Sequence, residues 1–225
     1  MIDKCISTIL CNLFFTVSMF CSSSVDSTEL FNRLFEKPAY KSWATYWSHA
    51  LVDVNFNNLQ LNIHRNGAIL FSKIDIDKYF SRRSVRNFTL NYSPNKDFVF
   101  DSYDDKEFSI ENDTLKYFGG DVDPSISILC LRDSLYCYHT NGPSSFYDES
   151  VWLSDNICVA LGFSWSASNI EEESGLFITL TLYDLQKKKE IVYLSQRFPF
   201  LQNQFRLNSF SYLKYKFPDI FIKQF

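Results

Sequence analysis

A succession of turns and strands occurs twice in this chain, and this repeat constrains the fold more than any other feature. The two copies lie at about 90–145 and 150–195. Each has a polar turn, a buried strand, a later strand that ends on Asp, and one more strand. Short apolar segments bounded by Ser, Asn, Asp and Pro are typical of antiparallel strands. The repeat predicts a mainly β fold, an antiparallel meander. In order, the segments are Ser93–Asp97, Phe98–Asp101, Ser127–Asp133 and Leu135–His139, then Leu153–Asn156, Ile157–Gly162, Thr179–Asp184 and Glu190–Leu194.

This arrangement resembles the blades of WD-type and TolB-type β-propellers. Three segments carry a second resemblance, namely Phe100–Tyr103, Gly119–Asp123 and Asp148–Leu153. Together they resemble, more closely, a group of uncharacterised bacterial envelope lipoproteins. The resemblance implies a location and a fold, and no activity. Because a propeller needs about four blades to close, two blade-like copies predict a partial propeller or open sheets.

The apolar stretch at 6–20 predicts export. It is too short to cross a hydrocarbon core, which needs about twenty residues, and it has the length of a signal-peptide core. We therefore expect residues 1–24 to be a signal peptide or lipoprotein signal and residues 25–225 to form a single β-rich domain. Three alternatives stay open for this segment: a lipid anchor on Cys21, ordinary cleavage near Ser24, and either an uncleaved anchor or an apolar stretch that is not an export signal. The expected location is the cell envelope, periplasmic or anchored to the outer membrane.

A short amphipathic helix is expected at Asp26–Lys37. Apolar residues recur there at helical spacing, Asp26 can cap the helix, and Pro38 ends it. The aromatic cluster that follows, which includes Trp43 and Trp47, is expected to pack under a sheet.

Asn66-Gly67 is the strongest hairpin signal in the chain, because both residue types tolerate the positive φ of a tight turn. It predicts that the strand before it pairs with a returning strand at 68–76.

Three cysteines lie outside the export segment, and two of them are candidates for a disulfide. If Asp133-Ser134 is a two-residue turn, Cys130 and Cys137 lie opposite each other at a distance that a disulfide can span. Cys158 is then left as a free thiol.

One acidic cluster in the sequence is a candidate metal site. It consists of Asp101, Asp104, Asp105, Asp121 and Asp123. Oxygen-rich clusters can hold Ca²⁺, but the glycine and the terminal Glu of a calcium loop are missing. Turn geometry also accounts for Asp and Gly here. We therefore expect neither a metal nor any other cofactor.

Several function classes lack support in the sequence. The net charge is −4 and no basic stripe occurs, which argues against nucleic-acid binding. No Gly-x-Ser-x-Gly motif is present, and the three histidines have no metal-ligand spacing. We expect a non-catalytic envelope protein with a binding or structural role. Its surface would be the loops at 101–123 and 139–150, and its partner an envelope protein or a glycan. Contact with a membrane is expected only through a lipid anchor. The alternative is an envelope hydrolase that uses the aspartates, with or without a metal.

Overall fold

The computed structural model describes residues 27–51, 56, 59–82, 84–104, 106–111, 114–118, 125–140, 145–166, 175–199, 209–220 and 222–224. The chain divides into two compact units, Met1–Glu36 and Lys37–Phe225. In the first unit, helix α2 (Ser27–Phe35) confirms the expected N-terminal helix. The rings of Phe31 and Phe35 stack on one side of it, with centroids 5.7 Å apart. The export segment, Cys21 and the expected cap Asp26 lie outside the described residues.

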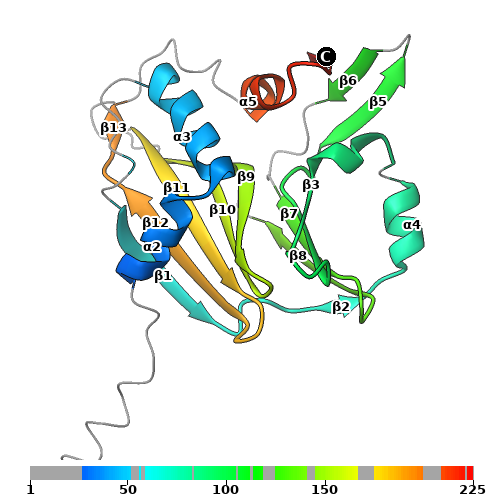
Figure 1. Ribbon diagram of the computed structural model, residues 1–225, viewed down its shortest axis with the longest axis horizontal. Coiled ribbons are helices and arrows are strands. Elements are labelled where there is room, and N and C mark those ends of the chain that lie inside the picture. Colours follow the sequence, from blue (N-terminus) through cyan, green and yellow to red (C-terminus); the bar gives the residue numbers. More distant parts are fainter. Residues whose placement is uncertain are drawn as a thin grey trace, which may run out of the picture. The chain divides into compact units, whose positions relative to one another are not determined.

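The second unit is mainly β, as expected, and two antiparallel sheets in it have the same strand order (Figure 1). We call them the small sheet and the large sheet. The small sheet has the order β2 (Ser72–Lys73), β8 (Leu135–Thr140), β7 (Ser125–Cys130), β4 (Phe98–Asp101) and β3 (Leu90–Tyr92). The large sheet has the order β1 (Leu59–Asn66), β12 (Lys189–Ser195), β11 (Gly175–Asp184), β10 (Ile157–Ser166) and β9 (Ser145–Ser154), and β13 (Phe198–Pro199) also pairs with β11.

The two sheets correspond to the two copies of the repeat. In each copy the last hairpin closes with a four-residue turn, because Cys130 pairs with Leu135 and Asp184 pairs with Lys189. The final turn residue has a positive φ in both, 51° at Ser134 and 52° at Lys188. Within the described residues the sheets are open and form neither a closed barrel nor a propeller.

The hairpin expected at Asn66-Gly67 is wrong. Gly67 does have a positive φ of 68°, but β1 pairs with β12 and β2 pairs with β8. The chain therefore crosses from the large sheet to the small one. The returning strand is short because a helix, α4 (Ile76–Ser81), begins directly after it. Asp75 caps that helix by accepting a hydrogen bond from the Lys78 backbone N–H at 2.9 Å.

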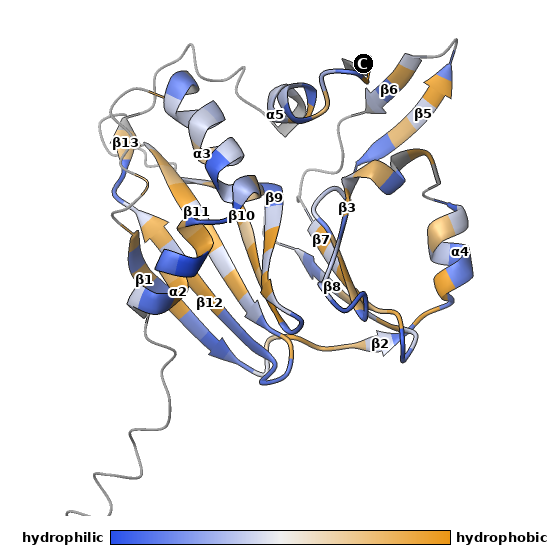
Figure 2. Ribbon diagram, viewed as in Figure 1, coloured by the Kyte–Doolittle hydropathy of each residue, from blue (hydrophilic) through white to orange (hydrophobic). Residues whose placement is uncertain are grey.

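The main core lies between the two sheets. Phe100 and Ile128 of the small sheet belong to one buried cluster with Trp152 and Cys158 of the large sheet. Because strand residues alternate between faces, Val99 and its neighbours point to the other side of the small sheet, where α4 covers them. The hydropathy colouring follows this pattern, with apolar colour on the central strands and polar colour at the turns (Figure 2).

The outer face of the large sheet is covered by α3 (Pro38–Ala50) (Figure 1). Trp43 and Trp47 of this helix are fully buried, and their rings lie 5.7 and 4.3 Å from that of Phe163. The aromatic cluster thus packs on a sheet as expected. Pro38 occupies the first turn of α3, where its missing N–H costs nothing.

The region 101–123, expected to be a loop, contains a β-hairpin. Strands β5 (Glu107–Glu111) and β6 (Thr114–Phe118) form a third sheet with β14 (Ile222–Gln224). Tyr103 and Tyr117 pack there against Leu213 of α5 (Ser209–Lys216) and against the short helix η1 (Ser84–Thr89). No helix in the described ranges combines the length and the apolar character that crossing a bilayer requires.

Candidate binding cleft

A cleft of about 370 Å³ opens between the start of α3, strands β3 and β9, and helix α5. One wall is the first turn and a half of α3, with Ala39 and Ser42 on the lining. The lining also includes Asn91 of β3 and Lys216 of α5. Phe88 and Thr89 of η1 complete the lining, and because the residues are spread from Pro38 to Lys216, only the folded chain brings these side chains together.

A charge pair between a buried Glu149 and a half-buried Lys216 forms part of the cleft lining. The side chain of Glu149 on β9 is almost fully buried, and its Oε2 accepts hydrogen bonds from the Tyr212 hydroxyl at 3.0 Å and from Lys216 Nζ at 2.6 Å. Its Oε1 accepts from the Ser150 backbone N–H at 2.9 Å. Burial, and then the charge of Glu149, raises the pKa of Tyr212, so the phenol stays protonated and remains a donor. The pair leaves this wall neutral overall.

Asn91 joins the two sheets beside the charge pair. Its side-chain amide donates to the Ser150 carbonyl oxygen at 2.6 Å and to the Ser150 hydroxyl at 3.0 Å. The indole N–H of Trp152 donates to the Asn91 backbone carbonyl at 3.1 Å. These bonds hold β3 beside β9 and fix the shape of the cleft.

Asp148, next to Glu149, anchors α3. Its Oδ2 accepts from the indole N–H groups of Trp43 at 3.2 Å and of Trp47 at 3.0 Å, and its backbone carbonyl accepts from the Tyr103 hydroxyl at 2.9 Å. Asp148 is the extra residue of a β-bulge, because Leu161 pairs with Glu149 and Gly162 pairs with Tyr147. A bulge re-aims the side chains around it. It thus lets neighbouring residues of one strand hold two different helices.

The aspartates weighed as a metal site are only partly described. Asp101 and Asp104 both accept from the Tyr79 hydroxyl, at 3.0 and 3.1 Å, and Asp104 also accepts from Ser127 at 2.5 Å. These bonds fasten α4 to the small sheet. Asp105, Asp121 and Asp123 lie outside the described residues. No group of three or more His, Cys, Asp or Glu side chains in the described ranges is placed to hold a metal ion.

The expected disulfide is not formed, and the register behind it is wrong. The turn spans 131–134, so Cys137 lies opposite Ile128, and Cys130 opposite Leu135. Cys130, Cys137 and Cys158 are buried free thiols, and burial raises the pKa of each above its ordinary value. Protonated buried thiols are poor nucleophiles.

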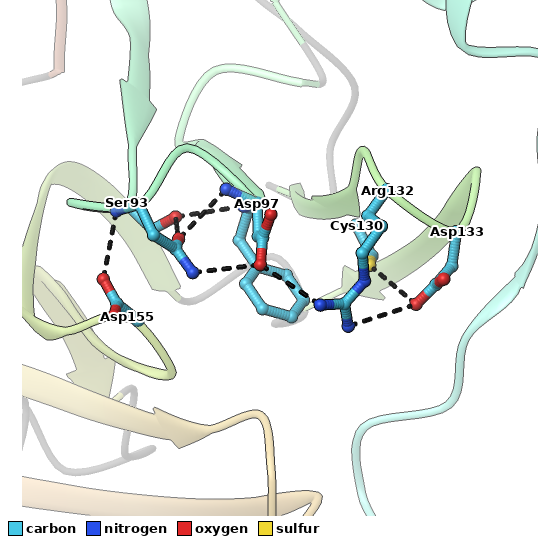
Figure 3. A network of polar contacts seen from close by, with 8 residues as sticks. Ser93, Asp97, Cys130, Arg132, Asp133 and Asp155 are labelled. Carbon is cyan, nitrogen blue, oxygen red and sulfur yellow. Dashed lines mark hydrogen bonds and ion pairs between the residues drawn. The ribbon is translucent and has the colours of Figure 1, made fainter.

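A polar network at the turns connects the two copies of the repeat (Figure 3). Asp155, in the β9–β10 turn, accepts from the Asn95 backbone N–H of the β3–β4 turn at 3.0 Å. Asp97, in that same turn, accepts from Arg132 of the β7–β8 turn at 3.4 Å. Arg132 also pairs with Asp133 at 3.6 Å. Each carboxylate in this network has a structural role in a turn.

The cleft residues were not predicted from the sequence. Asp148 and Glu149 lie in a segment quoted only for a resemblance, although two adjacent carboxylates before the apolar run Val151–Leu153 are a signal of their own. Carboxylates are rarely buried unless they are paired. Their partners in α3 and α5 carry no signal of their own, because nothing local relates position 47 or 216 to position 148.

Comparison of the chain with protein-family models, with curated proteins and with solved structures finds no match. The function is therefore inferred from the described side chains.

Proposed function

We propose that this protein is a non-catalytic, exported protein of the cell envelope that binds a small ligand in the cleft between α3 and α5. The apolar stretch at 6–20 supports export. The cleft supports binding, because its volume of about 370 Å³ falls in the range of about 300–1,000 Å³ that is usual for small-molecule sites.

The bonding of Glu149 is the observation that carries the choice of binding over catalysis. A general acid or base needs a carboxyl oxygen that can reach a proton of the substrate. Both oxygens of Glu149 already accept hydrogen bonds, from Lys216 and Tyr212 on one side and from the Ser150 backbone on the other. The group is therefore suited to hold the wall of a site together.

The alternative, an envelope hydrolase, would use Asp101 and Asp104. Asp101 is fully buried, and both carboxylates hydrogen-bond to the Tyr79 hydroxyl. This bonding favours a role in fastening α4 over a role in a reaction.

Retention of small molecules tests the proposal. Purified full-length protein is incubated with a small-molecule extract of the native envelope, separated by ultrafiltration, and the retained compounds are measured by mass spectrometry over time. Ala39→Trp fills the cleft, and Ala44→Trp places the same side chain elsewhere on α3 as a control.

We expect a compound that the wild type and Ala44→Trp retain, that Ala39→Trp does not retain, and whose mass stays constant. A compound whose mass changes with time would favour the hydrolase. Equal retention by both variants, or no retention by any form, would contradict binding in this cleft.

A further inference from the structure

We infer that the ligand of this cleft is a neutral, hydroxyl-rich molecule of one or two rings, that is, a mono- or disaccharide. This inference rests on the proposed binding function and adds the chemical class of the ligand. It is carried by three properties of the lining: its charge, its hydrogen-bonding groups and its apolar part.

The charges at the cleft disfavour ions of either sign. A bound anion would lie near the Glu149 carboxylate, which is buried and so poorly screened by solvent. A bound cation would lie near Lys216 and the positive end of the α3 dipole. Because Glu149 and Lys216 already neutralise each other at 2.6 Å, an ion that paired with one of them would have to break this pair and leave the buried Glu149 carboxylate or the half-buried Lys216 without its partner. A neutral ligand meets neither obstacle.

The hydrogen-bonding groups suit hydroxyl groups. Ser42 and Ser150 contribute hydroxyls to the lining, and a hydroxyl can both donate and accept a hydrogen bond. A sugar hydroxyl also does both, so it can pair with such a group in either sense. Asn91 holds the Ser150 hydroxyl at 3.0 Å, which orients one of these groups before any ligand binds.

The apolar part of the lining comes from three elements. It consists of Pro38 and Ala39 of α3, Phe88 of η1 and Leu90 of β3. Sugar rings present apolar C–H faces besides their hydroxyls, so a lining of both kinds matches them. The volume of about 370 Å³ is at the low end of the range for ligand sites, which limits the ligand to a small molecule.

Binding to a defined panel tests the ligand class. Full-length protein is titrated by calorimetry and by ligand-observed NMR with glucose, galactose, N-acetylglucosamine, maltose and cellobiose. Glucose 6-phosphate, inorganic phosphate, glycine and lysine form the charged arm. Each titration is repeated with Ala39→Trp, with its control Ala44→Trp, and with Ser42→Ala beside Ser48→Ala, which removes an exposed hydroxyl of the same helix.

We expect at least one neutral sugar to bind more tightly than every charged compound. Ala39→Trp should weaken that binding at least tenfold, and Ser42→Ala about fivefold, the effect of one hydrogen bond. The two controls should bind like the wild type. Melting curves of all variants verify that each is folded.

The other outcomes separate the two proposals. If a charged compound bound most tightly and Ala39→Trp weakened its binding, the assignment of a sugar ligand would be overturned and the proposed binding function would stand. Sugar binding that Ala39→Trp leaves unchanged would show that the site lies elsewhere and overturn the inference. No binding by any member of the panel would also overturn the inference, while the retention experiment with envelope extract would still decide the binding function.

Discussion

Glu190 connects the two sheets through charge. It lies on β12, is nearly fully buried, and its carboxylate lies 3.3 Å from His139 Nε2 on β8 and 3.3 Å from Arg65 on β1. Burial alone would raise its pKa. The hydrogen bonds and charges of His139 and Arg65 outweigh burial, and the pKa falls below its ordinary value of 4.5.

This lowered pKa predicts a dependence of stability on pH. The charged form of Glu190 stabilises the folded chain above pH 4.5, and that contribution is lost as the pH falls through the lowered pKa. We expect Glu190→Gln to lower the free energy of unfolding at pH 7 by about 1–3 kcal/mol, and the difference to shrink below pH 4.5. Urea unfolding between pH 7 and 3 measures it, with the exposed Glu107→Gln as the control. A difference that stays constant over this range would contradict the assignment.

The buried Asp148 should matter through its two indole donors. In Asp148→Ala, the N–H groups of Trp43 and Trp47 lose an acceptor inside the protein. We expect a loss of about 3 kcal/mol or more in the free energy of unfolding, and a smaller loss in Asp148→Asn, which keeps a side-chain carbonyl. Asp155→Ala removes a comparable but solvent-exposed hydrogen bond and should cost less. Equal losses for the buried and the exposed positions would show that α3 is held in another way.

At this scale the sequence predicts conformations better than partners. The positive φ of Gly67 was expected from residue type, and it occurs. The burial of Trp43 and Trp47 was expected from their aromatic character, and it also occurs. The acceptor for both indoles was not found, because the three residues meet only after α3 has docked on β9.

Among the elements, the bulge in β9 sets the strictest local requirement. Beside it, a methyl group on Gly162 would overlap the carbonyl oxygen of Phe146 in the neighbouring strand. At Gly67, in contrast, a methyl group would meet nothing within 4 Å, and only the positive φ resists it.

We therefore expect Gly162→Ala to cost about 3 kcal/mol, as overpacking does, and Gly67→Ala about 1 kcal/mol. Thermal and urea unfolding of both variants measure the difference. If Gly67→Ala were the more damaging change, the crossing between the sheets would be less tolerant than the bulge.

The length of the β7–β8 turn explains why the expected disulfide between Cys130 and Cys137 is absent. A two-residue turn at Asp133-Ser134 would place Cys130 opposite Cys137, and a four-residue turn shifts the pairing so that Cys137 meets Ile128. Residue types alone do not separate these turns, because Asp and Ser suit both.

We predict that Cys130, Cys137 and Cys158 all stay reduced in the exported protein, since they are buried free thiols. Alkylation before and after denaturation, followed by non-reducing peptide mapping, measures this. All three should react only after denaturation. A cross-linked peptide that contains Cys130 and Cys137 would contradict this prediction and support a two-residue turn at Asp133-Ser134.

On the scale of the whole molecule, export remains a prediction from the apolar stretch at 6–20. Intact-mass analysis of protein from the native envelope should find a chain that lacks residues 1–20 or more. If Cys21 carries a lipid, Cys21→Ala should move the protein from the membrane fraction to the soluble fraction. Full-length protein in a cytoplasmic fraction would contradict export.

The repeat predicted the two sheets because it consists of local sequence patterns, namely polar turns followed by apolar strand segments. The edge strands β1 and β2 were misplaced, and the β5–β6 hairpin, which forms a third sheet with β14, was missed. The pairing of β1 and β2 depends on which sheet edge is open once the two meanders exist, and that information is spread over the whole chain.

The position of β1 at the edge of the large sheet has a consequence for biosynthesis. Leu59 pairs with Ser195, and Asn66 with Lys189, so β1 cannot pair until β12, which lies near the end of the chain, has been synthesised. A ribosome must deliver almost the entire chain before the large sheet can close. Such distant pairing gives a high contact order, and high contact order slows folding. Until Ser195 has been made the large sheet stays incomplete, and an incompletely folded polypeptide is the form that can still be threaded through a translocation channel.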